Sequence, residues 1–415
     1  MSERIDEHSA SGRPAGEGDL PSGLHLAVAL DGAGWHQAAW RTADARPGEL
    51  FTAGYWTGLV SEAEHALLDF VTFEDSLGLQ SSRFDGPDDR LDQIRGRLDA
   101  VLLAARLAPV TSRIGLIPTT STTHTEPFHV AIGIATLDHI SRGRAGWRPQ
   151  VSPRASDARH FGRREFPEFD PGRLTDPAFA EHARGLFAEA ADAVEVVRRL
   201  WDSWEDDAEI RDVATGRFID RDKLHYIDFT GPYFSVKGPS ITPRPPQGQP
   251  LVTALAHDVL PYEFAAHGAD VVCVTPHSRD QAAAIIEQVR SAETKAGRSL
   301  KIFADLLVFL DDDASSAEAR KARLDDLDGA PLTSDALIVT DTPGGLADLL
   351  LDWRSAGIDG FRLRPGVLPH DLIGITRGLV PELRRRGMFR DAYEADTLRG
   401  LLGLARPANR YASTR

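Results

Sequence analysis

The chain has almost no cysteine, since Cys273 is the only one among 415 residues. A single thiol excludes an intrachain disulfide, a zinc cluster built from several cysteines and a Cys-x-x-Cys redox pair. The sequence therefore predicts a protein of a reducing compartment, and we expect a cytoplasmic location.

Long apolar runs are also missing. Runs such as Leu24–Leu30 have the length of a strand and fall well short of the ~20 residues that span a bilayer. The first 22 residues, MSERIDEHSASGRPAGEGDLPS, are polar and lack the apolar core of a secretory signal. We expect residues 1–22 to form a disordered tail and expect no membrane partner.

Basic residues are in deficit, with 47 Lys and Arg against 62 Asp and Glu and a net charge of −15. Phosphate backbones and anionic headgroups need a basic footprint, so nucleic acid and membrane surfaces are poor partners for this chain. The hydrophobic fraction of 42% is ordinary for a globular protein with a large core.

Short apolar or β-branched runs alternate with longer amphipathic segments along the chain. The eight runs are Leu24–Leu30, Phe70–Phe73, Arg113–Thr120, Arg144–Trp147, Leu251–Ala256, Ala269–Thr275, Lys301–Leu310 and Gly360–Leu363. Eight βα units predict a (β/α)8 TIM barrel in the α/β class. A doubly wound sheet produces the same alternation, so the pattern alone leaves that architecture open.

A long stretch separates the fourth and fifth runs, and no single crossover helix needs that length. We expect an insertion over about residues 150–249 of one TIM-barrel domain, residues 23–415. Within it, Phe187–Trp201 has the periodicity of an amphipathic helix, and a hairpin-rich segment follows. A second excursion, Gly329–Pro343, is expected to cap the barrel mouth.

The carboxyl ends of barrel strands form the active face, and their residues exclude several chemistries. The first strand ends in DGAGWH, which lacks the His-x-His of a binuclear metal hydrolase. The middle strands end in Thr119, Trp147 and His257 in place of the carboxylates of magnesium-dependent enolate chemistry. No strand end carries a Schiff-base lysine. Histidines, hydroxyls and aromatics remain, and they suit a planar organic cofactor.

Two of these features have simpler interpretations. Asp75 can cap the segment that follows it as readily as it can contact a cofactor. A group of His124, His129, Asp138 and His139 has the residue types of a metal site, but histidines at helix starts are most often only hydrogen-bonded. We therefore predict no metal.

Several motifs resemble the bacterial-luciferase-like flavin monooxygenases, in the branch of the nitrilotriacetate and dibenzothiophene-sulfone monooxygenases. The resemblance covers nearly the whole chain after the tail. The motifs are GWHQAAWR (Gly34–Arg41), DFVTFEDSLGL (Asp69–Leu79), TSRIGLIPTTSTTHTEPFH (Thr111–His129), LDHISRGRAGW (Leu137–Trp147), DARHFG (Asp157–Gly162), VEVVRRLWDSWEDDA (Val194–Ala208), YFSVKGPSITPRPPQGQP (Tyr233–Pro250) and LGLARPANR (Leu402–Arg410).

The resemblance implies a TIM barrel, usually a homodimer, that takes reduced FMN from a separate NAD(P)H-dependent flavin reductase. O2 would add to the flavin, and the resulting peroxyflavin would oxidise a small organic substrate. The protein would orient the flavin and exclude water from it.

The resemblance also suggests site residues by position. Asp75 and Thr119 match flavin contacts after the second and third strands, and His36 matches a pocket histidine with a catalytic role. Phe187 stands where the family usually has a tyrosine near the phosphate, and His182 lies close to a family histidine.

The chain departs from the family after three strands. Ala254 to Asp258 replace the family's Gln-Ala-Gly-Ser-Ser, so that His257 and Asp258 stand at the expected phosphate site. Asp258 would repel a phosphate, whereas a protonated His257 would attract it. Arg148 and Arg362 replace two asparagines and are expected to rebuild an anion site.

Two alternatives remain open. A related barrel could use a deazaflavin for hydride transfer without consuming oxygen. A non-catalytic flavin- or ligand-binding barrel could have lost the ordinary phosphate site.

Overall fold

The computed structural model describes residues 23–168 and 177–412 of the chain, so the predicted tail at residues 1–22 lies outside the described residues. Within the described part, no helix is both long enough and apolar enough to cross a membrane.

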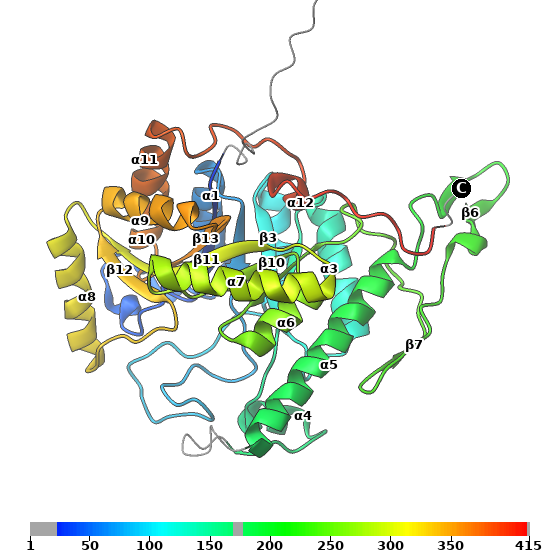
Figure 1. Cartoon of the computed structure of the whole chain (residues 1–415), viewed down its shortest axis with the longest axis horizontal. Helices are drawn as coiled ribbons and strands as arrows, with labels where there is room; N and C mark the ends of the chain where they lie inside the picture. The colour runs from blue at the N-terminus through cyan, green and yellow to red at the C-terminus, as the bar shows by residue number, and fades with distance from the viewer. Residues whose placement is uncertain (1–22, 169–176, 413–415) are drawn as a thin grey trace, which may run out of the picture.

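Parallel strands close into a barrel (Figure 1), because β13 pairs back to β1 and β10 pairs with β11. The barrel strands are β1 (His25–Leu30), β2 (Phe70–Phe73), β3 (Gly115–Ser121), β4 (Gly146–Gln150), β9 (Leu251–Leu255), β10 (Val271–Val274), β11 (Lys301–Leu310) and β13 (Gly360–Pro365). Each strand coincides with or overlaps one of the eight predicted runs. The TIM barrel is confirmed, and the doubly wound alternative is wrong.

Helices connect the strands and cover the outside of the barrel. They are α1 (Ala53–His65), α2 (Ala100–Leu107), α3 (Pro127–Ser141), α6 (Val259–Gly268), α7 (Arg279–Ala296), α8 (Ala314–Asp328), α9 (Pro343–Ser355), α10 (His370–Ile373), α11 (Val380–Arg385) and α12 (Leu398–Leu401).

Side-chain caps explain where several of these helices begin. Ser278, Asp313 and Thr342 each accept a hydrogen bond from a backbone N–H in the first turn of α7, α8 and α9. Glycines end two of the helices, since Gly297 and Gly329 follow α7 and α8 with φ of 67° and 82°. Most side chains avoid that left-handed conformation, so glycine suits these two ends.

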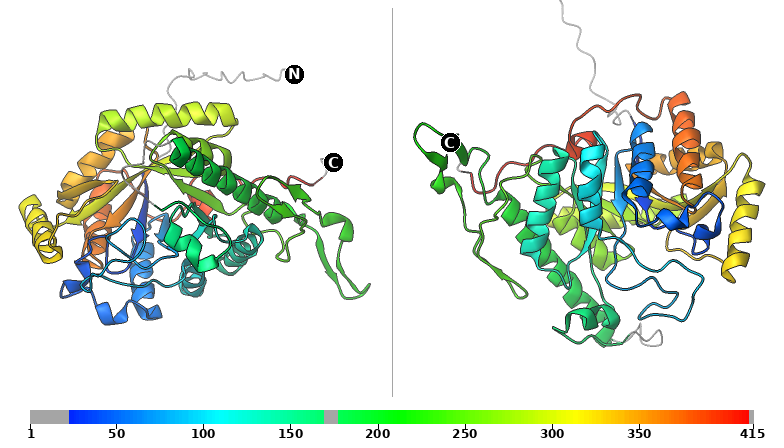
Figure 2. Two further views of the ribbon diagram at one scale, coloured as in Figure 1. Left: turned by 90° about the horizontal axis from the view of Figure 1, so that it is seen from below. Right: turned by 180° about the vertical axis from the view of Figure 1, so that it is seen from behind.

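The segment between β4 and β9 contains α4 (Ala155–Phe161), the long helix α5 (Pro177–Asp202) and two hairpins. Strands β5 (Glu209–Asp212) and β6 (Arg217–Ile219) form one hairpin, and β7 (Phe229–Thr230) and β8 (Ser235–Val236) form the other. The hairpins extend away from the barrel in both views of Figure 2. Helix α5 contains the predicted helix Phe187–Trp201.

A further strand, β12 (Leu337–Asp341), comes from the excursion predicted to cap the barrel mouth. It pairs in parallel with the second half of β11, where Leu306 to Leu310 extend beyond the end of β10. The excursion therefore adds a strand to the sheet, and the residues just before β12 lie at the carboxyl end of the barrel.

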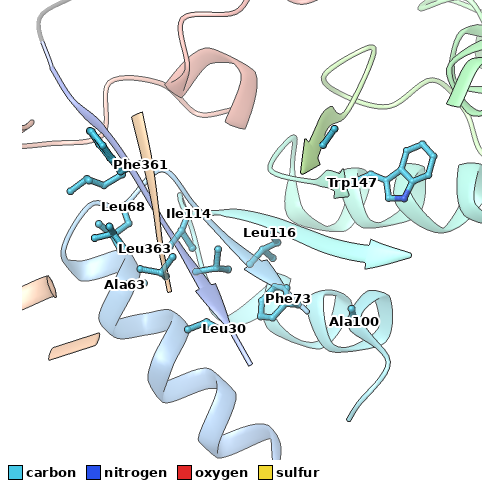
Figure 3. Packing of buried hydrophobic residues seen from close by; sticks show 14 of the residues in the cluster. Leu30, Ala63, Leu68, Phe73, Ala100, Ile114, Leu116, Trp147, Phe361 and Leu363 are labelled. Atoms are coloured by element: carbon cyan, nitrogen blue, oxygen red, sulfur yellow. The ribbon is translucent and has the colours of Figure 1, made fainter. Parts of the chain in front are cut away.

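The core has an outer and an inner part. Outward-facing side chains of β1, β2 and β13, such as Leu30, Phe73 and Leu363, pack against the surrounding helices (Figure 3). The inner part is apolar towards the amino ends of the strands and includes two leucines from the α12 region. Its members are Ala27, Phe70, Ile117, Leu251, Val271, Cys273, Phe303, Leu398 and Leu402.

Candidate active site at the carboxyl end of the barrel

Charged side chains fill the barrel interior towards the carboxyl ends of the strands. The Arg362 guanidinium lies against Asp305, with Nε–Oδ1 at 3.0 Å and Nη2–Oδ2 at 2.8 Å, and its Nη1 donates to Glu74 Oε1 at 3.2 Å. Arg148 also donates to Glu74, and Arg364 Nε donates to Asp305 Oδ2 at 2.9 Å. We call these five residues the ionic network.

The network is held in its charged form by its own pairing. Burial alone would raise the pKa of Glu74 and of Asp305, but the neighbouring guanidiniums outweigh burial and hold both pKa values below their ordinary range. Barrel interiors are usually filled by layers of branched apolar side chains. Here the layers nearest the active face are ionic.

Thr119 links the ionic network to the active face. Its Oγ1 donates to the Phe73 carbonyl at 2.8 Å and accepts from Arg148 Nε at 2.7 Å. Thr119 is 1% exposed, so its hydroxyl orientation is fixed by two buried partners. The residue therefore sits where the network ends and the adjacent pocket begins.

A pocket of about 350 Å³ opens beside Thr119, between the carboxyl ends of β2, β3 and β4 and the helices α2 and α3. Its wall includes Asp75, which the resemblance also selected. The complete lining is Asp75, Ser76, Leu77, Asp99, Val101, Leu102, Thr119, Thr120, Ser121, Thr125, His129, Val130, Gly133, Gln150 and Ser152. The structure thus brings two of the predicted cofactor residues, Asp75 and Thr119, into one cavity.

Gln150 has an unused polar atom at this pocket. Its Oε1 is buried and accepts no hydrogen bond from the described part of the chain. Buried acceptors are normally satisfied, and an unsatisfied one costs roughly 1–3 kcal/mol. A planar heterocycle with a ring N–H would satisfy this oxygen, and the apolar wall would contact its faces, so the pocket fits the ring system of a flavin.

Asp75 holds the start of α2 and also lines the pocket. Its Oδ2 accepts from the Ala100 N–H at the start of α2 at 3.0 Å, and its Oδ1 accepts from the Ser76 N–H at 2.7 Å. Burial raises the pKa of Asp75 above its ordinary value. The carboxylate therefore fixes α2 while it lines the pocket.

His36 lies outside the pocket lining and is 2% exposed. Its Nδ1 accepts from the Ala38 N–H at 3.0 Å, so Nε2 carries the proton and donates to Asp325 Oδ1 at 3.0 Å. Burial lowers the pKa of His36, and Asp325 opposes that shift only in part. Both ring nitrogens are therefore occupied in joining the loop after β1 to helix α8.

His182 and Phe187 lie on α5, and neither lines the pocket. Phe187 packs edge-on against Phe264 with ring centroids 5.8 Å apart. His182 meets Phe166 at 4.9 Å, and its buried Nε2 finds no hydrogen-bond partner among the described residues. The structure does not bring these two residues together with Asp75 and Thr119.

The residues expected at the phosphate end are already engaged. Asp258 caps α6, since its Oδ1 accepts from the Val259 N–H at 2.7 Å. His257 Nδ1 lies 3.0 Å from Thr275 Oγ1. Arg148 was expected to help to rebuild an anion site. In the structure its guanidinium is paired with the Glu74 carboxylate of the ionic network. The expected part of His257 and Asp258 in phosphate binding stays a prediction.

Arg362 meets the same outcome. It is fully buried between Asp305 and Glu74, which removes it from any ligand at the barrel mouth. The expectation that Arg362 helps to rebuild an anion site stays a prediction, and in this structure the guanidinium is paired with two carboxylates inside the barrel.

Sequence reasoning missed three residues that shape this region. Asp305 is the one acid within the apolar run of β11, KIFADLLVFL, and this pattern is a usable signal for a buried ion pair. Gln150 gave no signal, because its importance depends on the pocket around it. Asp335 lies in the connection between α8 and β12, and no local sequence pattern shows that its carboxylate pairs with Arg364.

Comparisons with known proteins agree with this architecture. Residues 33–358 match the model of the family described as luciferase-like monooxygenase. N-acetyl-S-(2-succino)cysteine monooxygenase of Bacillus subtilis (strain 168) is 31% identical, with 94% of this chain and 98% of the relative covered. Nitrilotriacetate monooxygenase component A of Aminobacter aminovorans is 30% identical, with the same two shares covered.

Solved structures show the same fold. The crystal structure of a long-chain alkane monooxygenase superposes with a TM-score of 0.81 at 24% identity, covering 92% of this chain and 96% of that chain. Riboflavin lyase, crystallised with modified FMN and riboflavin, gives a TM-score of 0.80 at 25% identity and covers 94% of this chain and 97% of that chain.

Proposed function

Because this chain belongs to the luciferase-like monooxygenase family, a class of flavin-dependent enzymes, we propose that it is the oxygenating component of a two-component system. It takes reduced FMN from a separate NAD(P)H-dependent reductase and uses O2 to oxidise a small organic substrate. The observation that carries this proposal is the pocket at the carboxyl ends of β2, β3 and β4, with its unsatisfied acceptor on Gln150.

Within this proposal, Asp75, Thr119 and Gln150 hold the flavin ring. Gln150 Oε1 offers an acceptor to a ring N–H, and Thr119 presents a hydroxyl whose direction is set by Phe73 and Arg148. When bound, the reduced flavin supplies the electrons that activate O2. The protein contributes orientation, hydrogen bonds and a site from which water is excluded.

The ionic network lies in the barrel interior next to the pocket and contacts it through Thr119. Its guanidinium and carboxylate groups are mutually paired, and Arg362 is fully buried, so charged side chains occupy the barrel interior at Glu74 and Arg362. We assign Arg148 a positioning role, because it orients the hydroxyl of Thr119 and meets Glu74. His36 is also a positioning residue in this proposal, since both of its ring nitrogens hold neighbouring segments in place.

Homodimer formation and a cytoplasmic location complete the proposal. Helices α2 and α3 and the turn after α2 expose large apolar side chains, with Leu102 at 71%, Ile140 at 46% and Val110 at 41%, and a second copy of the chain would cover them. The single cysteine, Cys273, is free and buried, as suits a reducing compartment. Light scattering coupled to gel filtration tests the dimer.

The test of the main proposal is an anaerobic titration with photoreduced FMN, followed by mixing with oxygenated buffer. We expect saturable binding and reoxidation of the bound flavin at a rate distinct from that of free flavin. Replacement of Gln150 by leucine should weaken binding about fivefold or more, since a lost hydrogen bond costs roughly 1 kcal/mol or more.

The matched control is Gln288→Leu, the same exchange at an exposed position of α7. It should bind reduced FMN as the unaltered chain does. Absence of binding, or reoxidation identical to that of free flavin, would contradict the proposal.

A further inference from the structure

The Asp335 carboxylate lies across the barrel mouth between the guanidinium of Arg364 and the imidazole of His257. Its Oδ1 accepts from Arg364 Nη1 at 2.6 Å, and its Oδ2 lies 3.2 Å from Arg364 Nη2 and 3.5 Å from His257 Nε2. The backbone carbonyl of Asp335 also lies 2.9 Å from His277 Nε2. One acidic residue thus contacts groups at the ends of β13, β9 and β10.

Asp335 does not belong to a barrel strand. It lies in the connection between α8 and β12, two residues before β12 begins at Leu337. Its side chain is 45% exposed, whereas the Arg364 side chain beneath it is only 3% exposed. A half-exposed carboxylate on a connecting segment therefore covers a buried guanidinium that is fixed to the barrel.

The charges of the ionic network do not balance without this carboxylate. The network has three guanidiniums, from Arg148, Arg362 and Arg364, and two carboxylates, from Glu74 and Asp305. One positive charge is left over, and it lies on the Arg364 side because Asp305 is shared between Arg362 and Arg364. A buried unpaired cation is costly, so this position requires an anion.

The surroundings of Arg364 resemble those of a ligand site more than those of a surface ion pair. The Trp35 ring lies over the guanidinium, 4.7 Å from its carbon to the ring centroid. His257, with a side chain 44% exposed, holds its Nδ1 at Thr275 and turns its Nε2 towards the anion. Guanidinium, imidazole and an aromatic face together recognise carboxylate and phosphate groups.

We propose that Arg364 and His257 form a binding site for an anionic oxyacid group of a ligand, and that Asp335 is an internal occupant which the ligand displaces. The site lies at the mouth of the barrel whose oxygenase activity is proposed above, and the identity of its ligand rests on that function. The anion is either a carboxylate of the substrate or the phosphate of the flavin. A ligand without such a group leaves Asp335 in place.

Equilibrium binding to Asp335→Asn tests this inference without flavin or oxygen. Asparagine keeps the shape of the side chain and removes its charge, so the variant should bind succinate or inorganic phosphate at least tenfold more tightly than the unaltered chain. Titration calorimetry and anion-dependent thermal stabilisation give the affinities. Succinamide serves as the neutral match to succinate, and Asp326→Asn, at an exposed position of α8, is the control for loss of one negative charge.

The two probes distinguish the sources of the anion. If Asp335→Asn gains affinity for succinate alone, the site is assigned to a substrate carboxylate. If it gains affinity for phosphate alone, the site is assigned to the flavin phosphate. The inference is overturned if the gain in anion affinity only equals that of Asp326→Asn, or if Asp335→Asn also binds succinamide more tightly. Asp335 is then an ordinary ion-pair partner.

A second variant guards against poor folding of Asp335→Asn. In the chain that keeps Asp335, His257→Leu removes the imidazole donor from the anion site without removing a buried charge. It should weaken phosphate or succinate binding, and unchanged binding would again overturn the inference. Because neither measurement uses flavin, failure of the anion site is separable from failure of the proposed oxygenase activity.

Discussion

Replacement of Glu74 by glutamine removes one of the two carboxylates of the ionic network while it keeps the size of the side chain. Glu74 accepts hydrogen bonds from both Arg148 and Arg362, and the Arg362 side chain is fully buried. The amide can offer one oxygen to these donors, but its NH2 group would face a guanidinium N–H. Arg148 would lose its carboxylate partner, and the three guanidiniums of the network would keep only one of its two carboxylates, that of Asp305.

The expected loss of stability follows from this unpaired charge. Breaking a buried ion pair by removing one partner costs about 3–5 kcal/mol. The unfolding entropy of about 2.1 cal/mol/K per residue gives about 0.9 kcal/mol/K for 415 residues. The unfolding midpoint of Glu74→Gln should therefore fall by about 3–6 °C.

Thermal unfolding followed by far-ultraviolet circular dichroism at one scan rate measures this shift. Glu287→Gln, the same exchange at an exposed position of α7, should leave the midpoint unchanged. The double variant Glu74→Gln with Arg148→Met should recover part of the loss, because it removes a cation together with its carboxylate. A shift for Glu74→Gln no larger than that of Glu287→Gln would refute the reasoning.

The pH dependence provides a second check on Glu74. Its pKa is held below the ordinary value, so its contribution is present above the unfolded pKa of about 4.3 and is lost as the pH falls through the lower folded value. The stabilities of the unaltered chain and of Glu74→Gln should therefore begin to converge as the pH falls below about 4.3 and should meet only below the folded pKa of Glu74. A difference that persists there would point to packing in place of charge.

Three further predictions follow from single contacts. His36→Ala and Asp325→Ala should each lower the free energy of unfolding by about 1–3 kcal/mol. The double variant should lose less than the sum of the two, because the pair shares one hydrogen bond of 3.0 Å, and urea denaturation measures this coupling. Asp258→Ser keeps a helix cap and removes a negative charge, so it should raise the affinity for reduced FMN relative to reduced riboflavin by about threefold or more in fluorescence titrations. Burial raises the pKa of Asp138 to about 6, so this group reduces stability as the pH rises from about 4 to about 6. Asp138→Asn should lack that slope in thermal unfolding at a series of pH values.

The fold could be predicted from the sequence because its signals are local. Each strand of the barrel is a short apolar or β-branched run, and each is followed by a segment of helical period. Strand β12 was missed because it is only partly buried and forms only where β11 extends past β10. That extension depends on the length of a neighbour, which no local window contains.

The site was predicted in part. Asp75 and Thr119 line one pocket because the ends of β2 and β3 meet at the same face of a parallel barrel. The expected roles of His36, His182 and Phe187 stay predictions, since these residues lie outside that lining. Their side chains turn to helix α8, to Phe166 and to Phe264, and such directions depend on tertiary packing.

The arginines show why a residue at a strand end cannot be interpreted alone. Arg148 and Arg362 follow apolar strand residues, so the sequence presents them as free cations at the active face. In the barrel, however, Arg362 lies in register with Asp305 on β11, and Arg148 lies in register with Thr119 on β3. Side chains that point inwards from the same level meet each other before they meet a ligand.

Strand register therefore decides which charges are available for binding. At the level of Asp305 the positive charge of Arg362 is cancelled by a partner on a neighbouring barrel strand, and nothing remains for a ligand. One level higher, Arg364 shares that same carboxylate and needs another anion, which a connecting segment supplies through Asp335. A ligand can replace a carboxylate on a connection far more easily than one built into the barrel, so Arg364, and neither Arg148 nor Arg362, is the arginine placed to determine which anions this enzyme accepts.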